Sequence, residues 1–217
     1  MDLWRPVGLQ EMALVFDSGM RAFPPRLPEQ PIFYPVLNRE YAVQIARDWN
    51  ALADPFAGYV LRFAIPDDYG VQFEPRTVGS SVHRELWIPA ERLTELNKQI
   101  RGPIVAESAY FGGEFRGYVP EDFGLKGRDA YAQIRTMIAS LGYSTFDFVM
   151  EMALETNGKA VFLHYPFWKA AGASRLDVAP SDLERCLAAM LKAWSMSPRP
   201  AALIEDGAWL DHTSKLS

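Results

Sequence analysis

The stretch FYPVLNREYAVQIA, residues 33–46, followed by GYVLRF at residues 58–63, decides the fold of this chain. The first stretch predicts a strand over 31–36 that leads into a helix running from Asn38 to about residue 50, because asparagine is a favoured N-cap. The second stretch lies in the clearest strand of the sequence, predicted over Gly58–Ile65. The residues expected on the inner face of the helix recur at helical spacing: Tyr41, Ala42, Ile45, Ala46 and Trp49.

Short strands and short helices alternate through the rest of the first half. Further strands are predicted over Leu3–Val7, Arg84–Ile88 and Ile104–Phe111, with helices over Leu9–Ser18, ending at Gly19, and from Pro89 to about Gln99. Four prolines within Phe23–Pro31 predict a stiff, extended loop. Strands of this length with few helices between them are typical of an α+β fold with a mainly antiparallel sheet.

The composition changes after residue 111. Residues 112–127 contain five glycines and predict a linker, which divides the chain into a first domain over 1–111 and a helical subdomain over 128–217. Ala160–Trp168 is too apolar to be exposed, and is either a buried strand or a core segment. The helices expected here cover Arg128–Leu141, Ser144–Glu155, and a segment from Pro180 to about Trp194 with Ser181 and Glu184 as a capping box.

Composition and charge argue against several classes of function without excluding nucleic acid. The net charge is −5 with no lysine- or arginine-rich run, which makes nucleic acid an unlikely main partner. We expect a cytoplasmic protein, since no apolar run approaches the ~20 residues that span a bilayer and no signal peptide is recognisable. The single Cys186 lies in an apolar helical pattern and is expected to be a small buried hydrophobe. His164 and His212 have no metal-ligand spacing, so no metal site is predicted.

Three short motifs in the first half carry the functional signal. Arg5 lies on the first strand, in LWRPVG. Tyr34 and Asn38 lie in IFYPVLN, where an aromatic strand enters the alanine-containing helix. His83 and Glu85 lie in HRELWIP, where a glutamate opens a later strand.

This order of motifs resembles the ADP-ribosyltransferase superfamily. The stretch at 33–46 followed by that at 58–63 is similar to the superfamily's second motif, in which a strand feeds a helix packed under the NAD site. Residues 1–110 also resemble a group of short bacterial proteins that carry an ADP-ribosylation label. The resemblance implies an ADP-ribosyltransferase-like fold for the first domain and NAD as the substrate.

The resemblance also implies roles for individual residues. Glu85 would be catalytic, because a carboxylate near the ribose can orient its 2′-hydroxyl and stabilise an oxocarbenium-like state. Arg5 would grip a phosphate or ribose oxygen, Tyr34 would stack on nicotinamide, and Asn38 completes the expected NAD-binding residues. His83 stands where arginine-modifying members carry a second glutamate, and is expected to face the target.

The sequence departs from the superfamily pattern and leaves two functions open. His83 matches neither the glutamate nor the glutamine of known relatives, and Phe33-Tyr34-Pro35 replaces the Ser-Thr-Ser strand of one class. The leading prediction is an NAD-dependent mono-ADP-ribosyltransferase, or an NAD glycohydrolase on the same scaffold. The other is a non-catalytic binding or immunity-type protein that keeps the fold and grips a protein partner. Rossmann and P-loop motifs are missing from the sequence.

Structural roles also fit the same residues. Arg5 could pair with a surface carboxylate, and Tyr34 could be a core tyrosine with a hydrated hydroxyl. Glu85 could be an edge-strand charge that discourages aggregation, and His83 a solvated loop residue. If the NAD prediction holds, Arg5, Tyr34 and Glu85 must line one cleft despite their separation in sequence.

Overall fold

The computed structural model describes residues 1–80, 82–121, 124–140, 146–196 and 198–210. The strands are β1 (Asp2–Gly8), β2 (Ile32–Phe33), β3 (Ala57–Ala64), β4 (Pro75–Thr77), β5 (Arg84–Leu86), β6 (Ile88–Pro89), β7 (Arg101–Phe111) and β8 (Gly207–Trp209). The α-helices are α1 (Leu9–Asp17), α2 (Arg39–Asp48), α3 (Asp67–Gly70), α4 (Leu93–Gln99), α5 (Ala130–Ser140), α6 (Phe146–Leu176) and α7 (Pro180–Met196). Short 3-10 turns cover Asn50–Leu52 and Ala90–Arg92.

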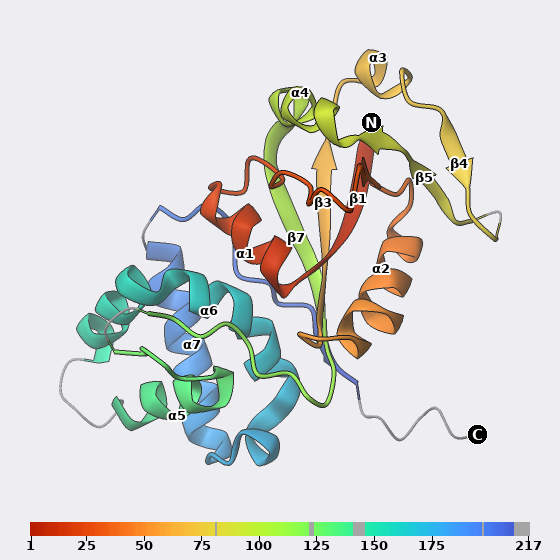
Figure 1. The fold of residues 1–217 in the computed structure, drawn as a ribbon. Coiled ribbons are helices and arrows are strands. Elements are labelled where there is room, and N and C mark those ends of the chain that lie inside the picture. The colour runs from red at the N-terminus through yellow and green to blue at the C-terminus, as the bar shows by residue number, and fades with distance from the viewer. Residues whose placement is uncertain (81, 122–123, 141–145, 197, 211–217) are drawn as a thin grey trace, which may run out of the picture.

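The central sheet has the strand order β1-β3-β7-β8, and Figure 1 shows β1, β3 and β7 side by side. Its first three strands are antiparallel, and β8 is parallel to β7. The pairs β2–β6 and β4–β5 are also antiparallel. Val36 connects the central sheet to the β4–β5 pair, because it bridges Trp4 on one side and Glu85 on the other. The prediction of an α+β protein rich in antiparallel pairing is confirmed at this level.

The two faces of the central sheet are covered by different helices. Helix α2 packs on β1 and β3 and forms a small apolar cluster: Val36, Tyr41, Ala42, Ala46 and Val60. Helix α1 and the C-terminal helices cover the other face, where one large apolar cluster includes residues from both halves of the chain. Figure 1 shows α2 and α1 on different sides of β1.

The contact between α2 and β3 requires a glycine at position 58. A Cβ on Gly58 would lie 2.0 Å from the carbonyl oxygen of Ala46, which is backbone and cannot turn aside. We expect Gly58→Ala to lower the free energy of unfolding by about 1–3 kcal/mol, measured by urea denaturation. Gly8→Ala, at the residue paired with Gly58 across the strands, is the control. Its added methyl would meet nothing closer than 3.9 Å. Equal losses in the two variants would contradict this account.

The C-terminal helices pack directly on the first half of the chain. The rings of Phe16 and Phe162 lie 4.8 Å apart between centroids, and the hydroxyl of buried Tyr59 donates a hydrogen bond of 3.0 Å to the carbonyl of Leu163. Cys186 is fully buried, as predicted, and burial raises the pKa of its thiol to about 12. None of the described helices is long and apolar enough to cross a bilayer. The division of the chain at residues 112–127 stays a prediction.

Two predictions for the C-terminal half need correction. Residues 160–168 are buried, but they belong to α6, so the strand alternative is wrong. The predicted end of a helix after Glu155 agrees with the structure, because α6 joins two helices across a kink at Asn157, which leaves helical geometry with φ −120° and ψ 25°. Helix α7 begins at Pro180, with the carbonyl of Ala179 accepting from its first turn. Ser181 therefore lies inside the helix and is not its cap. The expected helix boundaries at residues 141, 142 and 144 lie outside the described residues.

The first half differs from prediction at its strand and helix ends. The predicted 31–36 strand pairs only over Ile32–Phe33 and again at Val36. The predicted 84–88 strand is divided at Trp87 into β5 and β6. Pro89 precedes the first turn rather than occupying it, and that turn is 3-10. Trp49 is 55% exposed, because α2 ends at Asp48 and the next residue leaves helical geometry.

Candidate functional site

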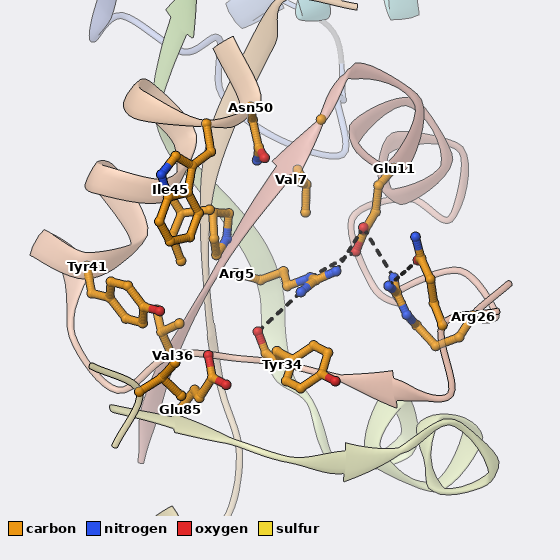
Figure 2. Close-up of a pocket in the computed structure, with 15 residues that line it drawn as sticks. Arg5, Val7, Glu11, Arg26, Tyr34, Val36, Tyr41, Ile45, Asn50 and Glu85 are labelled. Carbon is orange, nitrogen blue, oxygen red and sulfur yellow. Dashed lines mark hydrogen bonds and ion pairs between the residues drawn. The ribbon is translucent and has the colours of Figure 1, made fainter. Parts of the chain in front are cut away.

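A cleft of about 440 Å³ opens beside β1. Trp4 exchanges two backbone hydrogen bonds with Val36, of 2.9 and 2.7 Å. Next to this bridge the cleft is lined by residues 5–8 of β1 and by Tyr34 and Val36 (Figure 2). Residues from β1, α1, the proline-rich loop, α2 and β5 form its walls. The cleft therefore lies where distant parts of the sequence meet.

Arg5 spans the point at which β1 and the 34–36 segment separate. Its guanidinium donates to the carbonyl oxygen of Tyr34 at 3.2 Å. It also holds both carboxylate oxygens of Glu11 on α1, through Nε at 3.1 Å and Nη2 at 3.0 Å. Arg5 is 8% exposed, and its guanidinium lies 4.9 Å from the ring centroid of Phe33. The side chain is thus held rigidly at the base of the cleft.

Glu85 enters the cleft from β5 and is positioned by Trp87. The indole N–H of Trp87 donates to Oε1 of Glu85 at 2.6 Å. Trp87 is itself held by the ring of Tyr34, at 5.5 Å and nearly perpendicular, and by the guanidinium of Arg76 at 4.1 Å. Glu85 is 8% exposed, so its carboxylate has a fixed position and little solvent around it.

Two tyrosines also line the cleft. Tyr34 is half-buried, and Tyr41 projects from α2 on the side of Glu85 (Figure 2). Burial raises the pKa of Tyr41, and the negative charge of Glu85 raises it further. The Tyr41 hydroxyl therefore stays protonated at neutral pH and can donate a hydrogen bond to a ligand.

The structure brings three of the five predicted site residues into one cleft. Arg5, Tyr34 and Glu85 all line it, which is the convergence that the sequence analysis required. Asn38 instead caps α2: its Oδ1 accepts from the N–H of Tyr41 at 2.8 Å, and its Nδ2 donates to the carbonyl of Val82 at 2.6 Å. The amide group of Asn38 is thus already bonded at both ends within the protein.

His83 lies behind the cleft wall. Its ring stacks on Tyr41 with centroids 4.3 Å apart, and its Nε2 is 2.9 Å from the side-chain oxygen of Gln44. Its Nδ1 is 3.2 Å from the carbonyl of Val78. His83 thus packs against Tyr41. The expectation that His83 faces the target of the reaction stays a prediction.

Sequence reasoning missed Glu11, Arg26 and Trp87 as members of the site. Arg26 lies in the proline-rich loop and donates to Glu11 at 3.4 Å. Two signals could have identified Glu11 and Arg26. Glu11 is a glutamate in the first turn of the helix that follows Arg5, and Arg26 is a charged residue inside a stiff loop. The role of Trp87 depends on the break between β5 and β6, which the pattern did not reveal.

The described ranges contain no group of residues that could hold a metal ion, where such a group is three or more histidine, cysteine, aspartate or glutamate residues. Searches of protein-family models, curated proteins and solved structures found no match.

Proposed function

We propose that this cleft binds NAD and that the protein cleaves the bond between nicotinamide and ribose. The observation that carries the proposal is the meeting of Arg5, Tyr34 and Glu85 in one cleft from three separate parts of the chain. NAD joins a positively charged nicotinamide to a negatively charged pyrophosphate through one ribose. Figure 2 shows the carboxylate of Glu85 and the guanidinium of Arg5 at separate places in the cleft, with the ring of Tyr34 nearby.

The proposed reaction uses this separation of charge. The bond between ribose C1′ and the nicotinamide nitrogen breaks, and its electron pair leaves with nicotinamide, which becomes neutral. The positive charge then develops on the ribose, where Glu85 stabilises it. Water or an acceptor group attacks C1′ and loses a proton, which gives hydrolysis in the first case and ADP-ribosyl transfer in the second.

The surroundings of Glu85 suit this role. Trp87 donates to only one carboxylate oxygen, which leaves the other for the ribose hydroxyl. The low exposure of Glu85 strengthens its interaction with a developing positive charge, because the local dielectric is lower than that of water. An aromatic face at Tyr34 can stack on the flat nicotinamide ring.

Incubation of the protein with NAD labelled in its adenylate group tests the proposal. We expect release of nicotinamide at a rate above that of buffer alone. Label transferred to a macromolecule would identify a transferase, and label recovered only as ADP-ribose would identify a glycohydrolase. NAD that stays intact, together with no thermal shift on adding NAD, would contradict the proposal.

A non-catalytic binding protein is the second candidate. Its support is the bidentate ion pair between Arg5 and Glu11, which satisfies the arginine without any ligand. In that case the protein would bind a protein partner and leave NAD unchanged. Pull-down of a stoichiometric partner by both wild-type protein and a Glu85→Gln variant, with no nicotinamide release, would favour this alternative.

A further inference from the structure

Two arginines share one carboxylate on one side of the cleft (Figure 2). Glu11 Oε2 accepts from Arg5 Nη2 at 3.0 Å and from Arg26 Nη1 at 3.4 Å. The side chains are nearly enclosed, with exposures of 10% for each arginine and 19% for Glu11. Two positive charges therefore face one negative charge, and the cluster has a formal surplus of one positive charge.

Arg26 is the less well satisfied of the two arginines. Its Nε is buried without a hydrogen-bond partner among the described residues, and its other terminal nitrogen bonds only the neutral side chain of Gln30. Burial lowers the pKa of Arg26, and the charge of Arg5 lowers it further. Enclosing a cation with incomplete pairing is costly, so the position of Arg26 is not explained by a contribution to folding stability.

Glu85 does not neutralise this surplus. Figure 2 places Glu85 beside Val36 and Tyr41, whereas Glu11 and Arg26 lie together at another part of the cleft. The indole N–H of Trp87 further holds the Glu85 carboxylate in its own position. The surplus positive charge of Arg5, Arg26 and Glu11 is thus available to an anionic ligand.

We propose that Arg5 and Arg26 form a pyrophosphate subsite in which Glu11 acts as an internal counter-ion until the ligand binds. The assignment of the ligand as a dinucleotide pyrophosphate rests on the proposed function. Guanidinium groups bind phosphate oxygens through paired, charge-assisted hydrogen bonds. The ligand's two phosphates supply the negative charge that the cluster lacks, and Glu11 limits binding by competing for the same donors.

Titration calorimetry of this chain with ADP, adenosine and inorganic pyrophosphate tests this subsite. We expect Arg26→Gln to weaken ADP binding about tenfold or more, the loss of one charge-assisted contact, while adenosine binding stays unchanged. We expect Glu11→Gln to tighten ADP binding severalfold and to make it more sensitive to salt, because the competing carboxylate is removed. Inorganic pyrophosphate should follow ADP if the phosphates alone are recognised.

Arg92→Gln and Glu95→Gln are the matched controls, because Arg92 and Glu95 form an exposed ion pair outside the residues that line the cleft. Neither should change ADP affinity. Thermal unfolding checks that each variant folds, and if Arg26→Gln does not, Glu11→Gln decides the question. Wild-type protein that binds no ADP, an Arg26→Gln variant with wild-type affinity, or a Glu11→Gln variant that binds ADP no more tightly would overturn the proposal.

The same measurements separate this subsite from the reaction. Loss of ADP binding in Arg26→Gln without any nicotinamide release by wild type would support the subsite and refute the enzyme. Nicotinamide release by wild type and by Arg26→Gln at equal rate and equal KM would support the enzyme and refute the subsite.

Discussion

Replacing Glu85 by glutamine should reduce nicotinamide release by ~10²–10³ while leaving folding and NAD binding close to those of the wild type. Glutamine keeps the volume of the side chain and an oxygen that accepts from Trp87, whose indole N–H lies 2.6 Å from Glu85. It loses the negative charge that would face the oxocarbenium-like ribose. The rate is measured as nicotinamide released per enzyme at saturating NAD, and binding by calorimetry.

Glu107→Gln is the matched control for this substitution. Glu107 also accepts from an indole N–H, that of Trp4 at 3.1 Å, but it lies on β7 and does not line the cleft. Glu107 also forms partly exposed ion pairs with Arg39 and Arg62, at 3.1 and 2.8 Å. The substitution should leave turnover unchanged and lower the free energy of unfolding by about 1 kcal/mol or less, as is usual for such pairs. A Glu85→Gln variant with full turnover would remove Glu85 from the mechanism and with it the main support for an enzyme.

Acid should destabilise the protein through one buried histidine. His164 is fully buried, and its Nε2 accepts a hydrogen bond of 2.8 Å from the N–H of Tyr118. The proton therefore sits on Nδ1, which donates to Oε1 of Gln133 at 2.8 Å. Gln133 in turn donates to the carbonyls of Tyr118 and Arg128 at 2.8 and 2.7 Å. The network fixes the glycine-rich segment to helices α5 and α6.

Burial lowers the pKa of His164 to about 3, below its ordinary value of about 6.5. The unfolded chain binds this proton first as pH falls, so the stability contributed by neutral His164 is complete above pH ~6.5. It is lost progressively as the pH falls toward 3, with a slope that reaches about 1.4 kcal/mol per pH unit. Urea denaturation at a series of pH values measures this loss.

His164→Gln separates this contribution from that of the carboxylates. At neutral pH the substitution should cost about 1–3 kcal/mol, because it disturbs a buried hydrogen-bond network. The difference in free energy of unfolding between wild type and variant should become smaller as the pH is lowered from 6.5 to 4.5. The reason is that the variant has no group at this position that takes up a proton. A gap that stays constant over this range would show that His164 is not the group responsible.

The sequence predicts the local elements of the first half well, because caps and periodicity are local signals. Asn38 caps α2 through its side chain, as expected from residue type alone. Trp49 was placed wrongly because periodicity continues past the point where the helix ends at Asp48. Likewise, nothing in the apolar run 160–168 distinguishes helix from strand, since a segment buried on all sides has no amphipathic period.

The candidate site was only partly predictable from sequence. The family resemblance selected Arg5, Tyr34 and Glu85, which share the cleft. It could not show that Arg5 is paired with Glu11, since that contact depends on the angle at which α1 leaves β1. The network of His164 was equally hidden, because its partners Tyr118 and Gln133 lie 46 and 31 residues away in the chain.

The short strand β8 occupies part of what would otherwise be a free edge of the central sheet. It pairs with the last residues of β7. There the N–H of Ala109 donates to the backbone carbonyl of Asp206 at 2.9 Å, and the carbonyl of Phe111 accepts from the backbone N–H of Leu210 at 2.8 Å. Without β8 these groups would lie at an open edge, beside apolar side chains, where another copy could add a strand. The C-terminal half thus supplies backbone partners for the end of β7, independently of any chemistry in the cleft.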